Sequence, residues 1–385
     1  MQRLRILHVI PRLGIGGAEN IAAYLLLGLS QWHEVGVVSL YHYLENGLVG
    51  LLIKKGIQVY SLQKKSGLDA RMFWAVNRIF KRFQPQVVHT HLSVLRYVLP
   101  SLLIHKIPLA LHTLHNLAEY ETDSTGRLIN RIAFRRRVLP ITISCEVELS
   151  LRRVYGIKSA AMIPNGIPVE RYGKDLSFRA AWRKREGIDD RAIVFMCVGR
   201  LHRQKNPLLL IRAFAALVDI RNHLVFVGSG PLAEPLRAAA RTSGLEKRIH
   251  FLGGRHDIPN CLAAADAFVL ASDWEGNPLS VMEAMASGLP VISTAVGGIP
   301  ELLQSGQEGI LVQPGDTDAF SKAMDLLAVN ERMRIEMGKA GQLRAHANFA
   351  VERMVNAYNQ FCQTAITLPA GHKGDSLCEN HLRYR

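Results

Sequence analysis

Short apolar runs typical of buried strands alternate along the chain with longer segments typical of helices. In the first half the strand-like runs are RILHVI, HEVGVVSL, VVHTHL, LALHTLH and VLPITIS. From residue 192 onward the pattern restarts with IVFMCVG, HLVFVG, RIHFLG, AFVLAS and PVIST. Strands that alternate with helices predict parallel sheets covered by helices on both faces. The two series therefore predict an α/β protein with two doubly wound, Rossmann-like domains that face each other across a cleft.

Clustered turn residues suggest where the domains meet. The stretch IPNGIPVERYG contains the densest group of them, so we place a first domain at residues 1–170 and a second at 171–350. The 385 residues are enough for two domains of ordinary size. We expect residues 351–367 to form a helix that returns to the first domain, and residues 368–385 to be a loose tail.

The stretch SDWEGNPLSVMEAMASGLP predicts a short helix over residues 278–287. Asn277 suits the N-cap, Pro278 the first helical position and Gly288 the position just after the end. The backbone N–H groups and partial positive charge at the start of a helix attract anions. This segment therefore predicts an anion site.

Two strand ends earlier in the second half favour the same chemistry. Arg200 and Lys205 follow the strand IVFMCVG, and Gly228 and Gly230 follow HLVFVG, where they allow close backbone approach. Ligands of open α/β sheets bind beyond the carboxyl ends of the strands, so these loops and the helix start share one edge. A diphosphate is the ligand that this combination predicts.

Two glutamates bracket the start of the predicted helix. Glu283 lies inside it, where a carboxylate can accept two hydrogen bonds from a ribose diol. Glu275 lies just before it, beyond the expected phosphates and near whatever is attached to them. Taken singly, each glutamate is also explained as a solvated residue, and the same holds for Arg200 and Lys205. The prediction depends on all four together.

These motifs resemble those of a known family. The segments GRLHRQKN, VGSGPL, IPNGI and the run from residue 251 to 301 are similar to those of the family-four retaining glycosyltransferases of GT-B fold. Near the N-terminus, LGIGGAEN resembles the glycine-rich loop of that family, and TLHN resembles its active-site histidine segment. The resemblance extends to about residue 365. One departure is Asn277-Pro278, where the family often has Phe-Gly.

The resemblance implies sugar transfer from a UDP- or GDP-linked donor to a saccharide acceptor, with retention of configuration. Arg200 and Lys205 would hold the donor diphosphate and stabilise its growing charge. Glu283 would bind the ribose, and Glu275 would contact the donor sugar. Other donor contacts are implied for Gly16, Gly17, Gly230, the backbone near Arg255, and, because proline has no N–H, Leu279 and Ser280.

The acceptor side of the implied site depends on a histidine. His115 in LHTLHN is the best match to the family histidine at the acceptor hydroxyl, with His91 and His112 as alternatives. Each of the three could instead be a core or loop-bracing histidine. No Asp-x-Asp motif occurs, so we expect no metal and no cofactor, with cationic side chains and the helix start in their place.

The positive charge is concentrated in the first domain. Residues 1–170 contain 21 Lys and Arg against 10 Asp and Glu, whereas the remaining residues contain 26 against 22. Amphipathic segments at residues 69–83 and 124–137 carry basic stripes, the second one formed by Arg127, Arg131 and Arg135. Such stripes are typical of surfaces that bind anionic lipid or nucleic acid, although a solvated helix face gives the same pattern.

We favour the lipid. The chain has no recognised nucleic-acid-binding module and no aromatic stacking platform, so we expect no nucleic-acid partner. The longest apolar stretch is too interrupted to cross a membrane, the N-terminus does not resemble a signal peptide, and five scattered cysteines favour a reducing compartment. We therefore predict a cytoplasmic protein, peripheral on the inner face of the cytoplasmic membrane, that extends a lipid-linked saccharide.

Other enzyme classes fit less well. A sugar-nucleotide epimerase of the same fold would not need a basic first domain. A dinucleotide-dependent enzyme is disfavoured because GIGGAE is not GxGxxG and no acidic residue ends the next strand. A donor-binding scaffold without activity would be expected to lack one of the four charged residues, and all four are present.

Overall fold

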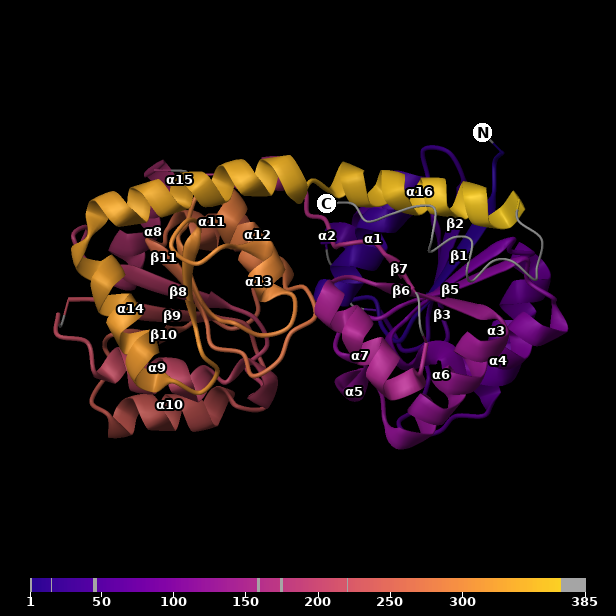
Figure 1. The fold of residues 1–385 in the computed structure, drawn as a ribbon, viewed down its shortest axis with the longest axis horizontal. Helices are drawn as coiled ribbons and strands as arrows, with labels where there is room; N and C mark the ends of the chain where they lie inside the picture. Colours follow the sequence, from indigo (N-terminus) through magenta and orange to yellow (C-terminus); the bar gives the residue numbers. More distant parts are fainter. Residues whose placement is uncertain are drawn as a thin grey trace. The chain divides into compact units, whose positions relative to one another are not determined.

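The computed structural model describes residues 2–14, 16–43, 47–157, 160–173, 176–219 and 221–367. The chain forms two compact units, one of Met1–Gly166 with Val351–Arg385 and one of Ile167–Ala350 (Figure 1). The sequence placed the boundary slightly later, at 170/171. The predicted loose tail, residues 368–385, lies outside the described residues.

The first unit is built on a parallel sheet of seven strands in the order β3-β2-β1-β4-β5-β6-β7. The strands are β1 Arg5–Ile10, β2 Glu34–Ser39, β3 Gln58–Ser61, β4 Val87–His91, β5 Leu109–Thr113, β6 Val138–Thr142 and β7 Ala161–Met162. The five runs predicted from the sequence are β1, β2, β4, β5 and β6. The short strands β3 and β7 were not predicted because neither has a sustained apolar run.

Helices cover both faces of this sheet (Figure 1). They are α1 Gly17–Leu29, α2 Gly47–Lys54, α3 Arg71–Phe83, α4 Leu95–Ile104, α5 Ala118–Glu121, α6 Ser124–Arg136, α7 Cys145–Tyr155 and α16 Val351–Thr367. A 3₁₀ turn at Leu92–Val94 joins β4 to α4. The two basic segments predicted from the sequence are α3 and α6.

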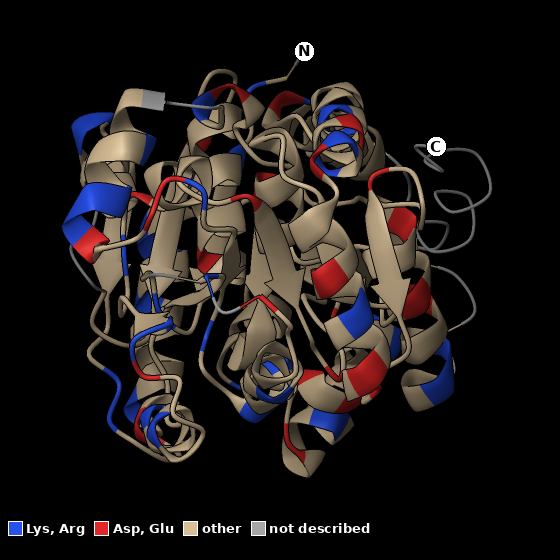
Figure 2. Ribbon diagram, turned by 90° about the vertical axis from the view of Figure 1, so that its left-hand side faces the viewer, with Lys and Arg blue, Asp and Glu red and all other residues tan. Residues whose placement is uncertain are grey.

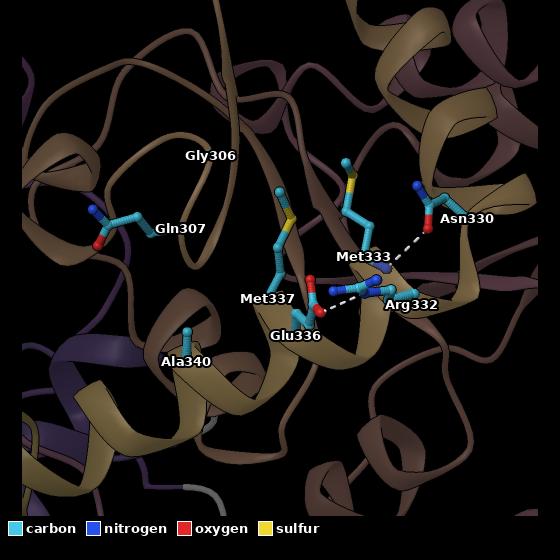
Figure 3. A pocket seen from close by; sticks show the side chains of 8 residues that line it. All are labelled: Gly306, Gln307, Asn330, Arg332, Met333, Glu336, Met337 and Ala340. Atoms are coloured by element: carbon cyan, nitrogen blue, oxygen red, sulfur yellow. Dashed lines mark hydrogen bonds and ion pairs between the residues drawn. The ribbon is translucent and has the colours of Figure 1, made fainter.

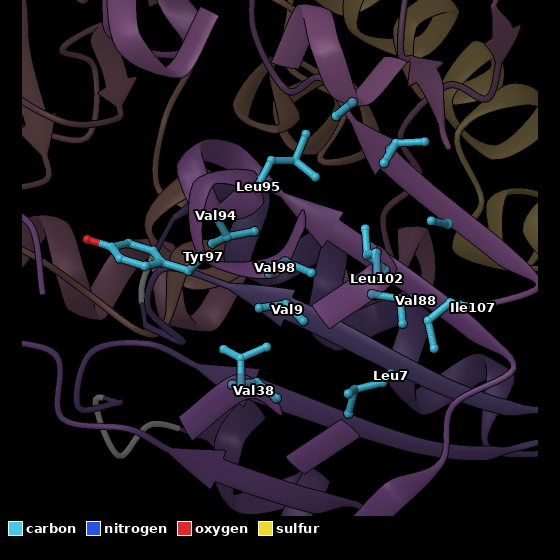
Figure 4. Close-up of a cluster of buried hydrophobic side chains, with 14 of the residues drawn as sticks. Leu7, Val9, Val38, Val88, Val94, Leu95, Tyr97, Val98, Leu102 and Ile107 are labelled. Carbon is cyan, nitrogen blue, oxygen red and sulfur yellow. The ribbon is translucent and has the colours of Figure 1, made fainter. Parts of the chain in front are cut away.

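The core of the first unit lies between the sheet and the layer that contains α3, α4 and α6. Figure 4 shows Leu7, Val9, Val38 and Val88 pointing from the strands into this cluster, where Val98 and Leu102 of α4 meet them. These side chains are almost completely removed from water. Burial of each contributes about 1.5–3 kcal/mol, which fixes the strand register and so the position of the loops.

The helix α16 packs against α1 in the first unit, so the predicted return of the C-terminal helix is confirmed. Gly28 permits the contact, since a Cβ there would lie 2.5 Å from Val355 Cγ1. A buried hydrogen bond of 2.9 Å between His33 Nε2 and Asn359 Oδ1 adds to it. Helix α16 is therefore part of the first unit's core.

The second unit contains a parallel sheet of six strands in the order β10-β9-β8-β11-β12-β13. The strands are β8 Val194–Val198, β9 His223–Val227, β10 Ile249–Phe251, β11 Ala267–Leu270, β12 Val291–Thr294 and β13 Gly309–Val312. The helices are α8 Leu176–Glu186, α9 Pro207–Ala215, α10 Ala233–Thr242, α11 Ile258–Ala263, α12 Leu279–Ala286, α13 Ile299–Leu302, α14 Thr317–Val329 and α15 Glu331–Asn348. The α/β class predicted from the sequence is confirmed for both units.

Charged side chains are spread along the helices, with lysine and arginine interspersed among aspartate and glutamate (Figure 2). On α6, the arginines at 131, 135 and 136 are exposed, and so is the apolar side chain of Ile132 between them. Within the described residues, the helices are too short or too polar for any of them to cross a bilayer.

Candidate active site

The carboxyl edge of the second sheet gathers most of the predicted site residues. Because all six strands are parallel, the loops after β8, β9, β11 and β12 meet at this edge. The loop after β8 contains Arg200 and Lys205, and the loop after β11 contains Glu275. The sequence predicted this convergence. The hydrogen bonds show which of the predicted residues contact one another.

Lys205 and Glu275 form a direct ion pair, in which Lys205 Nζ donates to Glu275 Oε1. The same carboxylate oxygen accepts a hydrogen bond of 2.6 Å from Ser272 Oγ. Glu275 is buried and Lys205 is only 16% exposed, so the pair is protected from water. Both charges are held in place, because leaving either one buried without its partner is strongly unfavourable.

The loop that bears Glu275 is tied to the loop that bears Lys205. Gln204 Nε2 donates to the carbonyl of Trp274 at 3.0 Å, and the carbonyl of Gln204 accepts from the backbone N–H of Asp273 at 2.8 Å. Asn206 adds a side-chain hydrogen bond to Asp273. These contacts fix the Lys205–Glu275 geometry through the backbone as well as through the side chains.

Gly297 lets the next loop approach this segment closely. Its φ is +54°, and a Cβ at this position would lie 1.8 Å from the carbonyl oxygen of Glu275. The backbone N–H of Gly298 donates to the carbonyl of Gly276 at 2.8 Å. A residue other than glycine at 297 would therefore push the Glu275 loop away from its place.

Glu283 lies in the middle of α12 and is also buried. Its Oε1 accepts a hydrogen bond of 2.9 Å from the hydroxyl of Tyr172. Burial raises the pKa of Glu283 to about 6, and the bond from Tyr172 opposes that rise. The carboxylate is therefore mostly ionised at neutral pH and can accept hydrogen bonds from a ligand.

The helix begins one residue later than the sequence predicted. Pro278 occupies the N-cap position with extended backbone and no side-chain cap bond, so Asn277 is not the N-cap and Pro278 is not the first helical residue. The physical reason is the φ and ψ of Pro278, −72° and 121°, which are not helical. The N–H groups at the helix start are consequently those of Leu279 and Ser280, the two residues predicted to meet the phosphates. Gly288, with φ of +72°, ends the helix as predicted.

The remaining donor-side residues lie around this centre without joining its hydrogen bonds. Arg200 is exposed near the beginning of the loop that follows β8. Arg255, after β10, forms an ion pair with Asp257 at 2.6 Å. Gly230 lies so close to the β8 loop that a Cβ would sit 2.3 Å from the carbonyl oxygen of Leu201. Arg200 is therefore an exposed positive charge in the same loop as Lys205, which is already paired with Glu275.

Sequence reasoning missed three residues of this centre. Ser272 and Tyr172 hold the two glutamates, and Gly297 shapes the Glu275 loop. Tyr172 is 111 positions away from Glu283 in the sequence, so no local pattern links the two. Gly297 could have been suspected from the Gly-Gly pair at 297 and 298, which often marks a special backbone position.

In the first unit the predicted acceptor residue, His115, lies in the loop after β5 and is partly exposed. Its Nε2 lies 2.9 Å from Nδ1 of His91, and its backbone N–H donates to Oε1 of the buried Glu121 at 3.4 Å. The two alternatives, His91 and His112, are completely buried. Of the three, His115 therefore has surface that a ligand can reach.

The glycine-rich loop of the first unit leads into α1. Gly16 is the N-cap of α1 and Gly17 its first residue. The φ of Gly16 is −177°, an extended conformation open to any residue. A Cβ there would meet the carboxylate of Glu19 at 2.3 Å, the end of a flexible side chain. The local need for glycine at position 16 is therefore weak.

A separate pocket of about 450 Å³ lies away from these loops (Figure 3). It is lined by residues that include Gly306 and Gln307, which precede β13, and Arg332 and Glu336 of α15. Arg332 Nε donates to Glu336 Oε1 at 2.7 Å, one turn further along α15. Since Gly306 and Gln307 precede a strand, this pocket is at the amino edge of the sheet, opposite to the candidate site.

Comparisons with known proteins agree with this arrangement. Residues 15–171 match the family model described as Glycosyltransferase Family 4, and residues 178–344 match the model described as Glycosyl transferases group 1. The chain belongs to the family-four glycosyltransferases of GT-B fold. Its activity is therefore glycosyl transfer.

Individual relatives refine the picture. The chain is 32% identical, over 66% of its length and 70% of the relative, to UDP-Gal:alpha-D-GlcNAc-diphosphoundecaprenol alpha-1,3-galactosyltransferase of Escherichia coli. It is 30% identical, over 69% of its length and 68% of the relative, to D-inositol 3-phosphate glycosyltransferase of Corynebacterium jeikeium. The solved structure of Anabaena HepE in complex with UDP and glucose superposes with a TM-score of 0.83 over 94% of this chain and 100% of that one, at 21% identity. That last likeness concerns the fold.

Proposed function

We propose that this glycosyltransferase takes its sugar from a nucleoside-diphosphate sugar and transfers it, with retention of configuration, to a lipid-linked saccharide in polysaccharide or glycoconjugate synthesis. The observation that carries the proposal is the group in the loop that leads into α12, where a Lys205–Glu275 pair is held by Ser272. A helix start and a lysine suit a diphosphate, and a carboxylate beside them suits sugar hydroxyls.

Each residue has a distinct task in this proposal. Lys205 and the exposed Arg200 stabilise the charge that develops on the diphosphate as the glycosidic bond breaks. The N–H groups of Leu279 and Ser280 bind the same phosphates. Glu283, set by Tyr172, accepts hydrogen bonds from the ribose diol.

The charge balance of the centre supports metal-independent chemistry. Glu275 offsets part of the positive charge of Lys205. The positive potential that stabilises the leaving group therefore comes from Lys205, Arg200 and the start of α12 together. When the bond to the anomeric carbon breaks, its electron pair remains on the diphosphate. The phosphate oxygen that gains this charge is the group we assign to take the proton of the acceptor hydroxyl.

A thermal-shift screen against sugar nucleotides tests the donor assignment. A ligand at a hundred times its dissociation constant raises the free energy of unfolding by about 2.7 kcal/mol. We expect UDP- or GDP-sugars to raise the melting temperature, and the corresponding nucleoside monophosphates to raise it less because they lack the second phosphate. Equal shifts with mono- and diphosphates would contradict a diphosphate site.

We further propose that the first unit binds the inner face of the cytoplasmic membrane through its basic surface. The exposed arginines of α6 surround Ile132, which is 46% exposed, and Trp74 on the basic helix α3 is 76% exposed. Basic side chains with interspersed apolar ones suit an anionic lipid surface, at about 1 kcal/mol for each Lys or Arg near it. The undecaprenol-linked substrate named for the Escherichia coli relative supports a lipid-linked acceptor.

Sedimentation with liposomes tests this second proposal. We expect binding that requires anionic lipid, weakens as salt rises, and falls when Arg131, Arg135 and Arg136 are all changed to Ser. A charge-matched control changes three exposed arginines of the second unit, at positions 191, 241 and 332, to Ser and should bind as the parent does. Equal loss in both triple variants would mean that net charge, and not this surface, determines binding.

A further inference from the structure

Three histidines of the first unit form one hydrogen-bonded chain. His8 Nδ1 lies 3.1 Å from His91 Nε2, and His91 Nδ1 lies 2.9 Å from His115 Nε2. They come from β1, the end of β4 and the loop after β5, which are neighbours in the sheet. His8 and His91 are completely buried, and His115 is the member that keeps some exposed surface.

All three rings are neutral near pH 7. Burial lowers the pKa of His8 and of His115 to about 3, and it lowers the pKa of His91 well below the ordinary value. A neutral imidazole has one N–H and one bare nitrogen. Because His91 uses both nitrogens in the chain, all the hydrogens in it must point the same way.

The direction is decided at the buried end. Among the described residues, His8 Nε2 is buried and has no hydrogen-bond partner. If the hydrogens pointed toward His8, this nitrogen would carry an N–H without an acceptor. If they point toward His115, it carries only a lone pair. Buried donors without an acceptor are rarer than acceptors without a donor, so the hydrogens point toward His115.

We propose that His8 and His91 are positioning residues that hold His115 in the form protonated at Nδ1, so that this ring donates a hydrogen bond to a sugar oxygen. In this arrangement His8 Nδ1–H donates to His91, and His91 Nδ1–H donates to Nε2 of His115. The role of His115 at a sugar oxygen rests on the proposed function. The protonation pattern of the three rings rests only on the hydrogen bonds among them.

The three hydrogen-bonded histidines do not relay a proton away from the site. Because every N–H in the chain points toward His115, a proton that reached His115 cannot be passed inward, and the far end, His8 Nε2, is buried and without a partner in the described residues. The neighbouring His89 has different bonds, to Thr113 Oγ1 at 2.7 Å and through it to the Tyr358 hydroxyl at 2.8 Å. The His8–His91–His115 chain therefore orients a ring and does not conduct protons.

A metal ion is the competing occupant of this cluster. Ligand atoms of His8, His89 and His91 all lie within 4.8 Å of one another. An ion bound there would use a His91 nitrogen that our proposal assigns to the chain. Elemental analysis of the purified protein therefore belongs to the test, and one equivalent of a tightly bound transition metal would overturn the proposal.

Nitrogen-15 NMR of the full-length protein with ring-labelled histidine gives the direct test. Long-range proton–nitrogen correlations distinguish Nδ1–H from Nε2–H rings, and His115→Gln identifies the His115 signals. We expect His115 to be protonated at Nδ1 in the unliganded protein. Protonation at Nε2 would overturn the proposal even if sugar transfer is confirmed. Conversely, an Nδ1–H signal in a protein without transferase activity would support the proposed hydrogen bonds among the histidines and refute only the proposed sugar transfer.

Variants of His91 separate orientation from mere packing. In His91→Asn the amide nitrogen replaces Nδ1, so it can still donate to His115; in His91→Leu nothing donates. We expect the Asn variant to keep the Nδ1–H signal and most of kcat. The Leu variant should shift His115 toward the Nε2–H form, which free histidine favours, and lower kcat by about tenfold at unchanged KM for the donor.

His112→Asn is the matched control, because His112 is equally buried but bonds to Thr90 and packs against Phe134 of α6. It should leave the His115 signals unchanged. A shift of the His115 tautomer in this control, or equal kcat in the Asn and Leu variants of His91, would assign the effect to general loosening of the core and overturn the positioning role.

Discussion

The two units place opposite kinds of polar chemistry on the same kind of scaffold. In the second unit the carboxyl edge of the sheet holds full charges, with Lys205 paired to Glu275 and Arg200 exposed nearby. In the first unit the corresponding edge holds neutral imidazoles linked to one another. Both sheets are entirely parallel and share one strand order, with a seventh strand added in the first.

The difference follows from what each edge is proposed to bind. A diphosphate leaving group gains charge as its bond breaks, so fixed cations and a helix start stabilise it. The acceptor group that reacts is a neutral hydroxyl, and orienting it requires a hydrogen bond of defined direction and not a charge. Burial contributes at both edges. It strengthens the attraction between Lys205 and Glu275 in the second unit, and it keeps His91 and His115 uncharged in the first.

The first prediction concerns the charged edge, where we expect the greatest loss of activity. Lys205→Ala should lower kcat by two to three orders of magnitude, about 2.7–4 kcal/mol, because it removes a group that stabilises developing charge. Arg200→Ala should act in the same direction. Steady-state kinetics with the sugar-nucleotide donor measures both. Arg203→Ala, an exposed arginine of the same loop, is the matched control and should keep its activity.

Loss of the fold must be separated from loss of chemistry in Lys205→Ala. The single change leaves Glu275 buried without its cation, so the melting temperature should also fall. The double variant Lys205→Ala with Glu275→Gln should recover the melting temperature but not the activity. Recovery of both would show that Lys205 acts only on stability.

The second prediction concerns the close approach that shapes the charged edge. Gly297→Ala should destabilise the second unit by roughly 2 kcal/mol or more, because the new Cβ meets the carbonyl of Glu275 and the backbone conformation disfavours alanine. Urea unfolding measures the change. Gly254→Ala is the control, since its Cβ would meet only Ser229 Oγ at 3.9 Å. Similar midpoints for the two variants would refute the constraint at 297.

The third prediction separates the two glutamates. Glu283→Gln should weaken nucleoside-diphosphate binding about tenfold, because its ribose contact exists in ground and transition states alike. Glu275→Gln should mainly lower kcat, because its contact is with the reacting sugar. Calorimetry with the bare nucleoside diphosphate and kinetics with the donor distinguish the two. Equal losses of affinity would show that the assigned roles are wrong.

The fourth prediction is a modest pH dependence of donor binding. Burial raises the pKa of Glu283 to about 6, above its value in an unfolded chain. The folded state therefore binds this proton more tightly than the unfolded chain does. As a result, the contribution of Glu283 to the free energy of unfolding falls as pH rises from about 4.5 to 6 and stays constant above about pH 6. Nucleotide affinity should change in the opposite sense, falling several-fold as pH drops below 6 and the carboxylate becomes neutral.

Calorimetry at a series of pH values measures the change in nucleotide affinity. The Glu283→Gln variant is the reference, because titration of the ligand affects parent and variant alike and cancels in the comparison. The difference between parent and variant should vanish at low pH. A difference that stays constant from pH 5 to 8 would show that the ionised form of Glu283 is not what binds the nucleotide.

Much of the fold could be predicted from the amino-acid sequence alone. The alternation of apolar runs with helical segments predicted two parallel α/β units, because burial on both faces requires continuous apolar strands. Local spacing was also enough for the end of α12 at Gly288, which adopts a positive φ. The start of α12 was misplaced by one residue, since the sequence does not reveal that Pro278 takes an extended conformation there.

Which of these residues act together depends on long-range packing and could not be predicted from the sequence. The Lys205–Glu275 pair and the Tyr172–Glu283 hydrogen bond join positions 70 and 111 residues apart. The histidine chain joins β1 to β4 and β5 across 83 and 24 residues. Such contacts depend on the order of strands in the sheet and on which face each side chain occupies. Those are set by the packing of the whole unit, because local sequence fixes the direction of a side chain only relative to its own strand.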